Sequence, residues 1–317
     1  MKILVISLSN LGDAILTYPA LWALWKAYPE AQFHVLAGPR TLELFASESR
    51  FQRVWVWEKI SPFWKQAALI TRLRFQRFRL VVDFRNSLIP LFLGARHTPI
   101  LRRPLNGRTH RVEHHLALVG DLGIPVDIKQ APLLLGQEDE RFFSKWIEPG
   151  QRVVVMAPGS RSHLKRWPAQ RFASVADQLI AQEQVQIVLV GAPEDRPISE
   201  EIHSCTRNRL LDLTGQTTIR QTAALLARAQ MLITNDSACL HAAEAMGTPT
   251  VAIFGPTDEK KYGPRNPRSI VVRRQLVCAP CERALCPYHH ECLQQLAVGE
   301  VYAAAARILA GGQGLPR

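Results

Sequence analysis

The sequence predicts an α/β protein built from two consecutive domains, each with a parallel sheet. Two observations lead to this prediction. Short apolar runs with the length of buried strands alternate along the chain with helical stretches, which is typical of βαβ units. The alternation stops in one polar segment near the middle and then restarts. A chain of 317 residues also has the length of two ordinary domains.

The first half predicts four strands with helices between them. Each strand is a run of aliphatic and aromatic residues, which a parallel sheet can bury on both faces. The predicted strands are KILVISLS at 2–9, FHVLAG at 33–38, RVWVW at 53–57 and LVVDF at 80–84, and the predicted helices are 13–28, 41–49 and 62–78.

The second half repeats the pattern after a connection at residues 133–151. This segment, LLLGQEDERFFSKWIEPGQ, is polar and holds a short helix followed by a Pro-Gly pair. We therefore expect domains at 1–148 and 149–317. The predicted strands are 153–160, 186–192, 210–215, 231–236 and 250–257, and the predicted helices are 168–183, 194–205, 218–229, 237–246 and 299–310.

Composition narrows the class of protein. With 47% hydrophobic residues the chain can bury a core, which excludes a disordered protein. The net charge of +12 favours an anionic partner, such as nucleic acid, an acidic membrane surface or a phosphorylated substrate, unless it serves solubility alone. No apolar stretch reaches the roughly 18 residues of a transmembrane helix, and the N-terminus lacks signal-peptide regions. We therefore expect a cytoplasmic protein.

Polar or Gly-rich turns follow several predicted strands. In open parallel sheets ligands bind beyond the carboxyl ends of the strands, and backbone amides at helix N-termini bind phosphate. Most of these turns lie in the second half, which we therefore expect to bind the phosphates of a nucleotide. Neither GxGxxG nor GxxxxGK[ST] occurs, which argues against Rossmann dehydrogenases and P-loop NTPases. The turns are 10–13, 158–165, 191–194, 235–241 and 255–258.

The first turn, in SLSNLGDAILTYPAL, carries a carboxylate where a phosphate-binding turn has glycines. If the phosphates bind in the second half, Asp13 is available to take a proton from an acceptor hydroxyl. The alternative is that Asp13 only caps a helix. In APGSRSHLKRWP, Ser160, Arg161 and Lys165 offer enough donors to bind a diphosphate without a metal, unless they are ordinary surface charges.

These segments resemble bacterial glycosyltransferase family 9, the ADP-heptose:lipopolysaccharide heptosyltransferases. The resemblance also rests on LVGAPED, on LTGQTTIRQTAALLARAQMLITNDSACLHAAEAMGTPTVAIFGPTD and on the C-terminal cysteines. It implies a GT-B fold, in which two Rossmann-like domains face each other across a cleft. The N-terminal domain would bind the acceptor and the C-terminal domain the nucleotide sugar. It further implies inverting, metal-independent transfer of a heptose or similar sugar from a donor such as ADP-heptose to a lipopolysaccharide core acceptor.

The resemblance also implies site residues. Asp13 matches the general base of the family, and Thr257 and Asp258 in FGPTD can support the donor loop. Ala238-Cys239 stands where the family often has Gly-Pro. Because alanine adopts a positive φ less readily than glycine, the backbone approach to phosphate at Ala238 stays open. The implied donor-binding residues are Ser160, Arg161, Lys165, Glu194, Asp236, Ser237 and His241.

The segment CAPCERALCPYHHEC at 278–292 concentrates four of the six cysteines. In a cytosolic chain this spacing favours a structural zinc or iron ion over disulfides, with His289 or His290 as a replacement ligand. Reduced thiols or a disulfide pair are the alternatives. We expect Cys205 and Cys239 to be small buried residues. The predicted metal ligands are Cys278, Cys281, Cys286 and Cys292.

Two basic segments lie in the first half. RLRFQRFR combines arginines with Phe75 and Phe78, and LRRPLNGRTHRVEHH follows it. They suit an anionic lipid-linked acceptor and peripheral attachment to the inner membrane, or a solvated helix face. Arginine alternating with phenylalanine also suits RNA, but no recognition fold is evident, so we expect no nucleic-acid partner. The predicted acceptor-binding residues are Arg72, Arg74, Arg77 and Arg79, and the second segment adds Arg102, Arg103, Arg108 and Arg111.

Two other functions stay open from the sequence. One is a nucleotide-sugar epimerase or hydrolase on a similar two-domain scaffold, which would need no lipid acceptor. The other is a non-enzymatic nucleic-acid-binding protein stapled by a metal at the cysteines. The number of chemically equipped strand-end turns favours the glycosyltransferase, for which we expect no catalytic cofactor.

Overall fold

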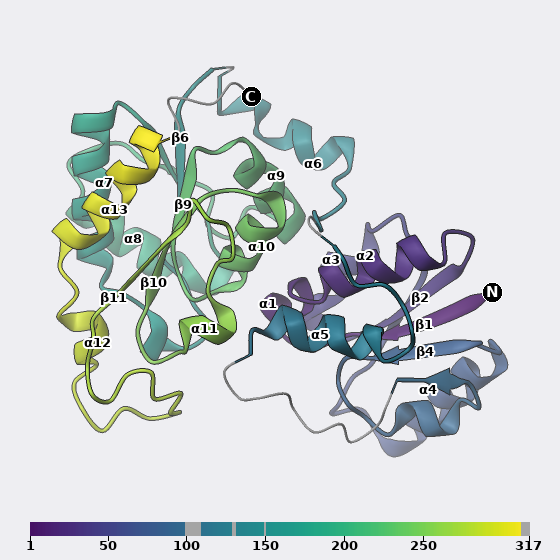
Figure 1. Cartoon of the computed structure of the whole chain (residues 1–317). Coiled ribbons are helices and arrows are strands. Elements are labelled where there is room, and N and C mark those ends of the chain that lie inside the picture. The colour runs from purple at the N-terminus through teal and green to yellow at the C-terminus, as the bar shows by residue number, and fades with distance from the viewer. Residues whose placement is uncertain (99–108, 129–130, 149, 312–317) are drawn as a thin grey trace. The chain divides into compact units, whose positions relative to one another are not determined.

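The computed structural model describes residues 1–98, 109–128, 131–148 and 150–311, and its chain divides into two compact units, Met1–Leu134 and Leu135–Arg317 (Figure 1). The division comes before the boundary predicted at residue 148. Helix α6 (Gln137–Arg141) belongs to the second unit because it contacts helix α9 (Ile219–Arg228). There Arg220 Nε lies 3.3 Å from Asp139 Oδ2.

The first unit contains a five-stranded parallel sheet in the order β3-β2-β1-β4-β5. Strand β1 is central, and its last residue, Ile6, pairs with Leu36 of β2 and Asp83 of β4. The carboxyl ends of these three strands therefore share one edge of the sheet. The strands are β1 Lys2–Ile6, β2 Gln32–Ala37, β3 Phe51–Val56, β4 Leu80–Asp83 and β5 Arg96–His97.

Helices cover the first sheet, and the helix predicted at 13–28 is in fact two helices. Pro19 has no N–H to donate to the Ile15 carbonyl, so the first helix ends and a second one begins at Tyr18. The sequence did not predict α5, whose two histidines weaken its helical pattern. The helices are α1 Leu11–Ile15, α2 Tyr18–Ala27, η1 Pro39–Thr41, α3 Leu42–Ala46, α4 Phe63–Phe75, η2 Ile89–Phe92 and α5 Arg111–Gly120.

The second unit contains a six-stranded parallel sheet in the order β11-β10-β9-β6-β7-β8. Strands β6, β9 and β10 are buried along their whole length, which explains their continuous apolar sequences. The edge strand β11 was not predicted. The strands are β6 Val153–Ala157, β7 Gln186–Leu189, β8 Leu211–Asp212, β9 Met231–Asn235, β10 Thr250–Phe254 and β11 Ile270–Arg273.

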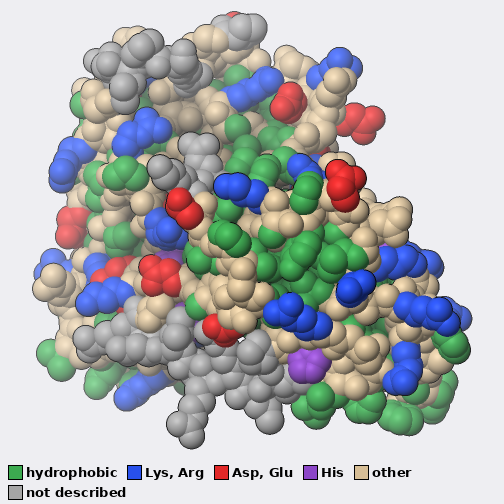
Figure 2. All heavy atoms as spheres, turned by 45° about the vertical axis from the view of Figure 1, so that its right-hand side comes forward, with side chains coloured by type: hydrophobic (Ala, Val, Ile, Leu, Met, Phe, Trp, Pro, Cys, Tyr) green, Lys and Arg blue, Asp and Glu red, His purple; other side chains and the backbone are tan. Residues whose placement is uncertain are grey.

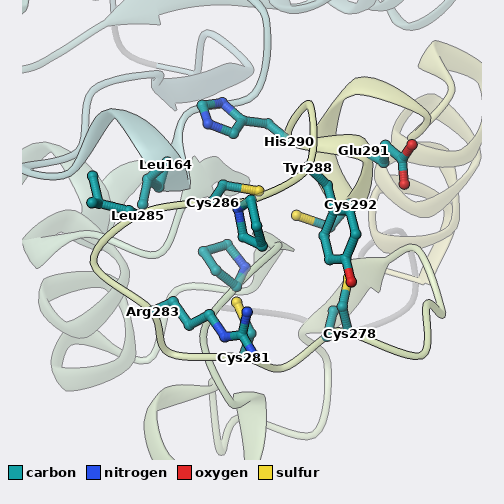
Figure 3. Close-up of a pocket in the computed structure, with 13 residues that line it drawn as sticks. Leu164, Cys278, Cys281, Arg283, Leu285, Cys286, Tyr288, His290, Glu291 and Cys292 are labelled. Atoms are coloured by element: carbon teal, nitrogen blue, oxygen red, sulfur yellow. The ribbon is translucent and has the colours of Figure 1, made fainter.

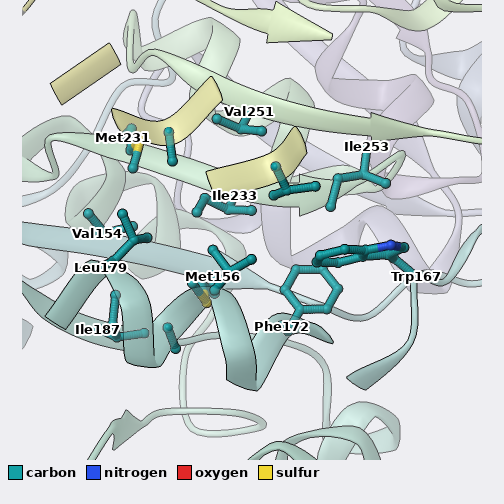
Figure 4. Close-up of a cluster of buried hydrophobic side chains, with 14 of the residues drawn as sticks. Val154, Met156, Trp167, Phe172, Leu179, Ile187, Met231, Ile233, Val251 and Ile253 are labelled. Atoms are coloured by element: carbon teal, nitrogen blue, oxygen red, sulfur yellow. The ribbon is translucent and has the colours of Figure 1, made fainter. Parts of the chain in front are cut away.

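The core of the second unit lies between its sheet and helices α7 and α13 (Figure 4). Trp167 and Phe172 are fully buried, with ring centroids 5.1 Å apart in an edge-on contact. The prediction of two parallel-sheet α/β domains is confirmed. The remaining helices are η3 Phe142–Lys145, η4 His163–Lys165, α7 Ala169–Glu183, η5 Pro193–Asp195, α8 Arg196–Cys205, α10 Ala238–Met246, α11 Glu259–Tyr262, α12 Glu291–Gln294 and α13 Val298–Gly311.

Candidate active site

The loops that follow β6 and β9 are joined by hydrogen bonds at the carboxyl edge of the second sheet. The Asn235 side-chain amide donates to the Pro158 carbonyl at 2.6 Å, and its Oδ1 accepts from the backbone N–H of Trp167 at 3.1 Å. The Ser160 hydroxyl donates to the Asp236 carbonyl at 2.9 Å. Because β6 and β9 are neighbours in the sheet, two segments far apart in sequence form one polar surface.

Lys165 and Asp236 form the central ion pair of this edge. Lys165 Nζ lies 2.6 Å from Asp236 Oδ2, and the aspartate side chain is only 6% exposed. The Arg166 Nε–H donates to the Ser160 carbonyl at 2.7 Å, and its Nη2 lies 3.9 Å from Asp195 Oδ1. An ammonium group has three donors, so Lys165 keeps two for a ligand. The sequence analysis missed Arg166, although it directly follows Lys165.

Helix α10 begins at this edge, directly after Asp236. Ser237 is its N-cap residue in extended backbone, and its hydroxyl lies 3.1 Å from Thr234 Oγ1. Ala238 is the first helical residue and has ordinary right-handed geometry, which alanine adopts readily. Glycine is therefore not required here. His241 is buried on the same helix.

The other predicted donor residues lie on loops at the same edge. Arg161 and Glu194 are exposed, after β6 and β7 respectively. Asp258 follows β10 and caps α11, because its carboxylate accepts from the backbone N–H of Lys260 at 3.0 Å. Thr257 is buried. The parallel sheet thus brings all the predicted donor residues to one edge.

Asp13 lies at the matching edge of the first sheet, in the first turn of α1, the helix that follows β1. Asn10 occupies the N-cap position of α1, so Asp13 is not the N-cap residue. The Asn10 side-chain amide instead donates to Asp13 Oδ2 at 2.9 Å. This contact orients a partly exposed carboxylate at a sheet edge, where a ligand hydroxyl can reach it.

The neighbouring strand β4 ends in a second carboxylate, which the sequence analysis did not single out. Asp83 accepts hydrogen bonds from the backbone N–H of Arg85 at 2.8 Å and from the backbone N–H and hydroxyl of Ser87 at 2.7 Å each. Burial raises its pKa, and these bonds partly offset the shift. Asp83 therefore fixes the loop after β4. The available signal was the charged residues Asp83 and Arg85 at the end of an apolar strand.

The predicted acceptor arginines lie away from Asp13 along the strands. Arg72 and Arg74 are in the last turn of α4, and Arg79 directly precedes β4, where its backbone N–H donates to the Lys2 carbonyl. These residues are near the amino edge of the sheet, one strand length of about 15 Å from the carboxyl edge. Arg77 lies between them at a φ of 54°. Arg102, Arg103 and Arg108 lie outside the described residues.

A family model decides the classification. The model for glycosyltransferase family 9 (heptosyltransferase) matches residues 66–291. The chain belongs to this family. The lipooligosaccharide heptosyltransferase 2 of Campylobacter jejuni is 27% identical to it over 330 residues, which cover 98% of each chain.

Solved structures agree with the fold. The ADP-heptose lipopolysaccharide heptosyltransferase II of Escherichia coli has a TM-score of 0.81 at 23% identity, covering 99% of this chain and all of its own. An E. coli heptosyltransferase solved with ADP has a TM-score of 0.72 at 18% identity, covering 97% of this chain and all of its own. The predicted GT-B fold is confirmed, and the chain is a glycosyltransferase of family 9.

The cysteine segment of this family 9 chain lines an apolar pocket (Figure 3). The sulfur atoms of Cys286 and Cys292 lie toward one side in this view and those of Cys278 and Cys281 toward the other. Across the described ranges of the chain, no three His, Cys, Asp or Glu side chains are arranged to bind a metal ion. The predicted zinc or iron site is therefore unsupported. Leu164, Pro256 and Tyr288 also line the pocket.

Polar contacts hold the cysteine segment in place. The sequence-based prediction had given this role to a metal ion. The backbone N–H groups of Cys281 and Glu282 both donate to the Pro256 carbonyl, at 3.0 and 2.8 Å. Lys261 Nζ lies 2.5 Å from Glu282 Oε2, and Arg273 Nη2–H donates to the Ala279 carbonyl at 2.9 Å. The segment is therefore ordered by its own chain.

Two of the thiols are harder to deprotonate than a free cysteine, because burial raises their pKa. Burial raises the pKa of Cys292, and the three neighbouring thiols raise it further. Burial also raises the pKa of Cys239 to about 12. All six cysteines are free thiols, and Cys205 at the end of α8 is exposed, so its predicted burial is wrong.

Proposed function

We propose that this chain transfers a heptosyl group from ADP-heptose to a lipopolysaccharide core acceptor, with inversion at the anomeric carbon. The family and the names of its relatives support the sugar and the acceptor class. The E. coli structure solved with ADP supports an adenine nucleotide. The observation that carries the proposal is chemical: one sheet ends in an oriented carboxylate, Asp13, and the other in the pair Lys165–Asp236.

The second unit would bind the donor. Lys165, held by Asp236, would use its remaining N–H groups on the diphosphate, and Arg161 would add a second positive charge. The first backbone amides of α10, a nine-residue helix, supply further donors for phosphate. Ser237 and His241 would lie near the donor sugar, and Glu194 near the nucleoside. Ser160 would hold the loop through the Asp236 carbonyl.

The first unit would bind the acceptor and supply the base. Asp13 would take the proton of the acceptor hydroxyl while the oxygen of that hydroxyl bonds to the anomeric carbon. The bond from that carbon to the diphosphate breaks at the opposite face, and ADP leaves with the electron pair. Lys165 and the helix amides stabilise the charge on the leaving phosphate. These groups suffice for the charge balance, so we propose transfer without a catalytic metal.

The four arginines of the α4 region would act on the acceptor at a distance from the reacting hydroxyl. Their place near the amino edge of the sheet suits the anionic, membrane-side part of a large lipid-linked molecule. We propose on this basis that the enzyme works peripherally at the cytoplasmic face of the inner membrane.

Incubation of the purified chain with ADP-heptose and a heptose-deficient core acceptor tests the proposal. We expect a product heavier by one heptose, stoichiometric ADP and an inverted anomeric configuration by NMR. The rate should be unchanged by EDTA. Hydrolysis of the donor without product, or release of an epimerised nucleotide sugar, would replace the proposal with one of the alternatives.

The variant Asp13→Asn tests the base. We expect turnover to fall roughly 10²- to 10⁴-fold while ADP binding is retained, because general-base help is of that size. Glu30→Gln is the matched control, since Glu30 is an exposed acid of the same unit. Near-normal turnover in Asp13→Asn would remove Asp13 from the mechanism.

A further inference from the structure

Several large apolar side chains of the first unit point into solvent. Phe63, Trp64 and Phe75 on α4 are 82%, 71% and 78% exposed. Leu91 and Phe92 of η2, and Leu88 directly before it, are also more than half exposed. The two segments contact each other, and Arg74 Nη1–H donates to the Phe92 carbonyl at 3.0 Å. We name this surface the α4 face; its apolar members are Ile60, Phe63, Trp64, Phe75, Leu88, Leu91 and Phe92.

The helix explains why these side chains are outside. Leu69, Ile70 and Leu73 pack against the core cluster of the first unit. Trp64 and Phe75 are about three turns apart at 3.6 residues per turn, so they share the opposite side of α4. The solvent-facing side of α4, with Trp64 and Phe75, is therefore an aromatic stripe. Nothing in the described part of this unit covers it.

Positive charges border this stripe. Residues 59–79 contain two lysines and four arginines and no aspartate or glutamate. At about 100° per residue, Arg74 falls on one side of the Trp64–Phe75 stripe and Arg72 and Lys65 fall on the other. Helix α4 lies at the lower edge of the first unit in Figure 1, and along this edge Figure 2 shows apolar side chains with Lys and Arg side chains above them.

The charge pattern selects the partner. A second copy of this surface would place arginine opposite arginine, which is unfavourable. An anionic bilayer matches both components, because aromatic side chains favour the membrane interface and cations bind lipid phosphates. None of the helices in the described part of the chain is long and apolar enough to span a membrane. A helix of this kind can instead lie in the interface.

We propose that the α4 face is a membrane-docking surface whose aromatic side chains enter the interface of an anionic bilayer while Lys59, Lys65 and the four arginines bind its phosphate headgroups. When α4 docks on the bilayer, the carboxyl edge of the first sheet, with Asp13, lies next to the membrane surface and is not covered by it. A lipid-linked acceptor could then reach Asp13 without leaving the bilayer. The docking itself does not depend on which sugar is transferred.

Co-sedimentation with vesicles tests this surface. The full chain should bind phosphatidylethanolamine vesicles containing phosphatidylglycerol, bind phosphatidylcholine vesicles much more weakly, and lose affinity as salt rises. Trp64→Ser/Phe75→Ser should weaken binding at least about tenfold, and Arg72→Gln/Arg79→Gln by about fivefold per charge removed. Both pairs replace exposed side chains, so thermal stability should be retained.

Matched controls lie in the second unit. Val277→Ser/Leu285→Ser removes two exposed apolar residues, and Arg207→Gln/Arg209→Gln removes two exposed cations. Neither control should change vesicle binding. Equal loss in a control and its partner variant, or no binding of the full chain to anionic vesicles, would overturn the proposal. The proposal would also be overturned if Trp64→Ser/Phe75→Ser abolished a dimer or an RNA complex of the chain but left vesicle binding unchanged.

An activity measurement separates this proposal from the proposed function. Trp64→Ser/Phe75→Ser should transfer sugar to a soluble, lipid-free acceptor fragment at the normal rate, but be slower than wild type on acceptor embedded in anionic vesicles. An equal loss on both acceptors would mean that the stripe contributes to the site, not to docking. If neither acceptor is used by the wild-type chain, the vesicle binding result still stands.

Discussion

Helix α4 of the first unit and helix α7 of the second unit use their apolar residues in opposite ways. α7 has 15 residues, of which Phe172, Val175 and Leu179 are among those completely buried. α4 has 13 residues, and Leu73 is its one fully buried side chain. The larger side chains of α4, Phe63, Trp64 and Phe75, face solvent. The apolar side chains of α7 stabilise the second unit, whereas part of the apolar surface of α4 is exposed and can contact a partner.

The largest expected effect comes from breaking this contrast directly. Phe172→Ala should lower the free energy of unfolding of the second unit by about 3–5 kcal/mol, because it opens a cavity beside Trp167. Phe75→Ala should change stability by less than about 0.5 kcal/mol, because its ring is already hydrated. Urea unfolding measures both. A large loss in Phe75→Ala would show that α4 is covered in solution.

The contrast extends to the carboxyl edges, where the second sheet carries the Lys165–Asp236 ion pair. Lys165→Met should weaken ADP binding about 10- to 100-fold, because a hydrogen bond to a charged group contributes about 1.5–3 kcal/mol. It also leaves the buried Asp236 without its cation, so thermal stability should be measured alongside titration calorimetry. Arg209→Gln, an exposed cation of the same unit, should leave both unchanged. Full ADP affinity in Lys165→Met would exclude Lys165 from the donor site.

The first unit has its own packed helix, α5, and pH can probe it. Burial lowers the pKa of His115 to about 3, helped by the charge of Arg111. The unfolded chain, with a pKa near 6.5, then takes up this proton first. Stability should therefore be complete above pH 6.5 and fall as the pH decreases toward 3.

The expected loss between pH 6.5 and 4.5 is about 1–2 kcal/mol, less than full burial would give because the residue is partly exposed. His115→Gln should remove this component of the urea-unfolding profile, whereas His289→Gln, which replaces an exposed histidine, should not. An unchanged profile in His115→Gln would show that the ring is hydrated.

The smallest effect is expected at the cysteine segment of the second unit. Because polar contacts already hold this segment, chelators should not change the melting temperature, and Cys278, Cys281 and Cys286 should react with a thiol reagent. Cys292 should react slowest, since burial raises its pKa. Elemental analysis is the check, and one zinc or iron ion per chain would restore the site predicted from the sequence.

Much of the fold could be predicted because parallel strands are buried on both faces and therefore have continuous apolar sequences. β6, β9 and β10 are of this kind. The two-residue β5 and the edge strand β11 were missed, since neither is long or buried enough to show the pattern. Pro19 indicates that one helix ends before Tyr18 and another begins there, and this signal was overlooked.

The candidate site was predictable where it follows from strand ends, as for Lys165 and Asp236. The use of Asn10 instead of Asp13 as the helix cap depends on backbone geometry that residue types do not fix. The cysteine spacing fits a metal loop and an apolar pocket equally well. The hydrogen bonds from this segment to the Pro256 carbonyl cannot be read from that spacing. Likewise, the α4 sequence predicts a helix but not which of its sides is covered.

The order of the strands along the chain also sets the order in which the two units can form during synthesis. All five strands of the first sheet are encoded by residue 97, so the first unit can fold while the second is still being made. The second core includes Val301, Ala305 and Leu309 of α13, which packs against α7. That core can close only after the last helix has left the ribosome. Until then, the nascent protein consists of a finished first unit that already displays the α4 face.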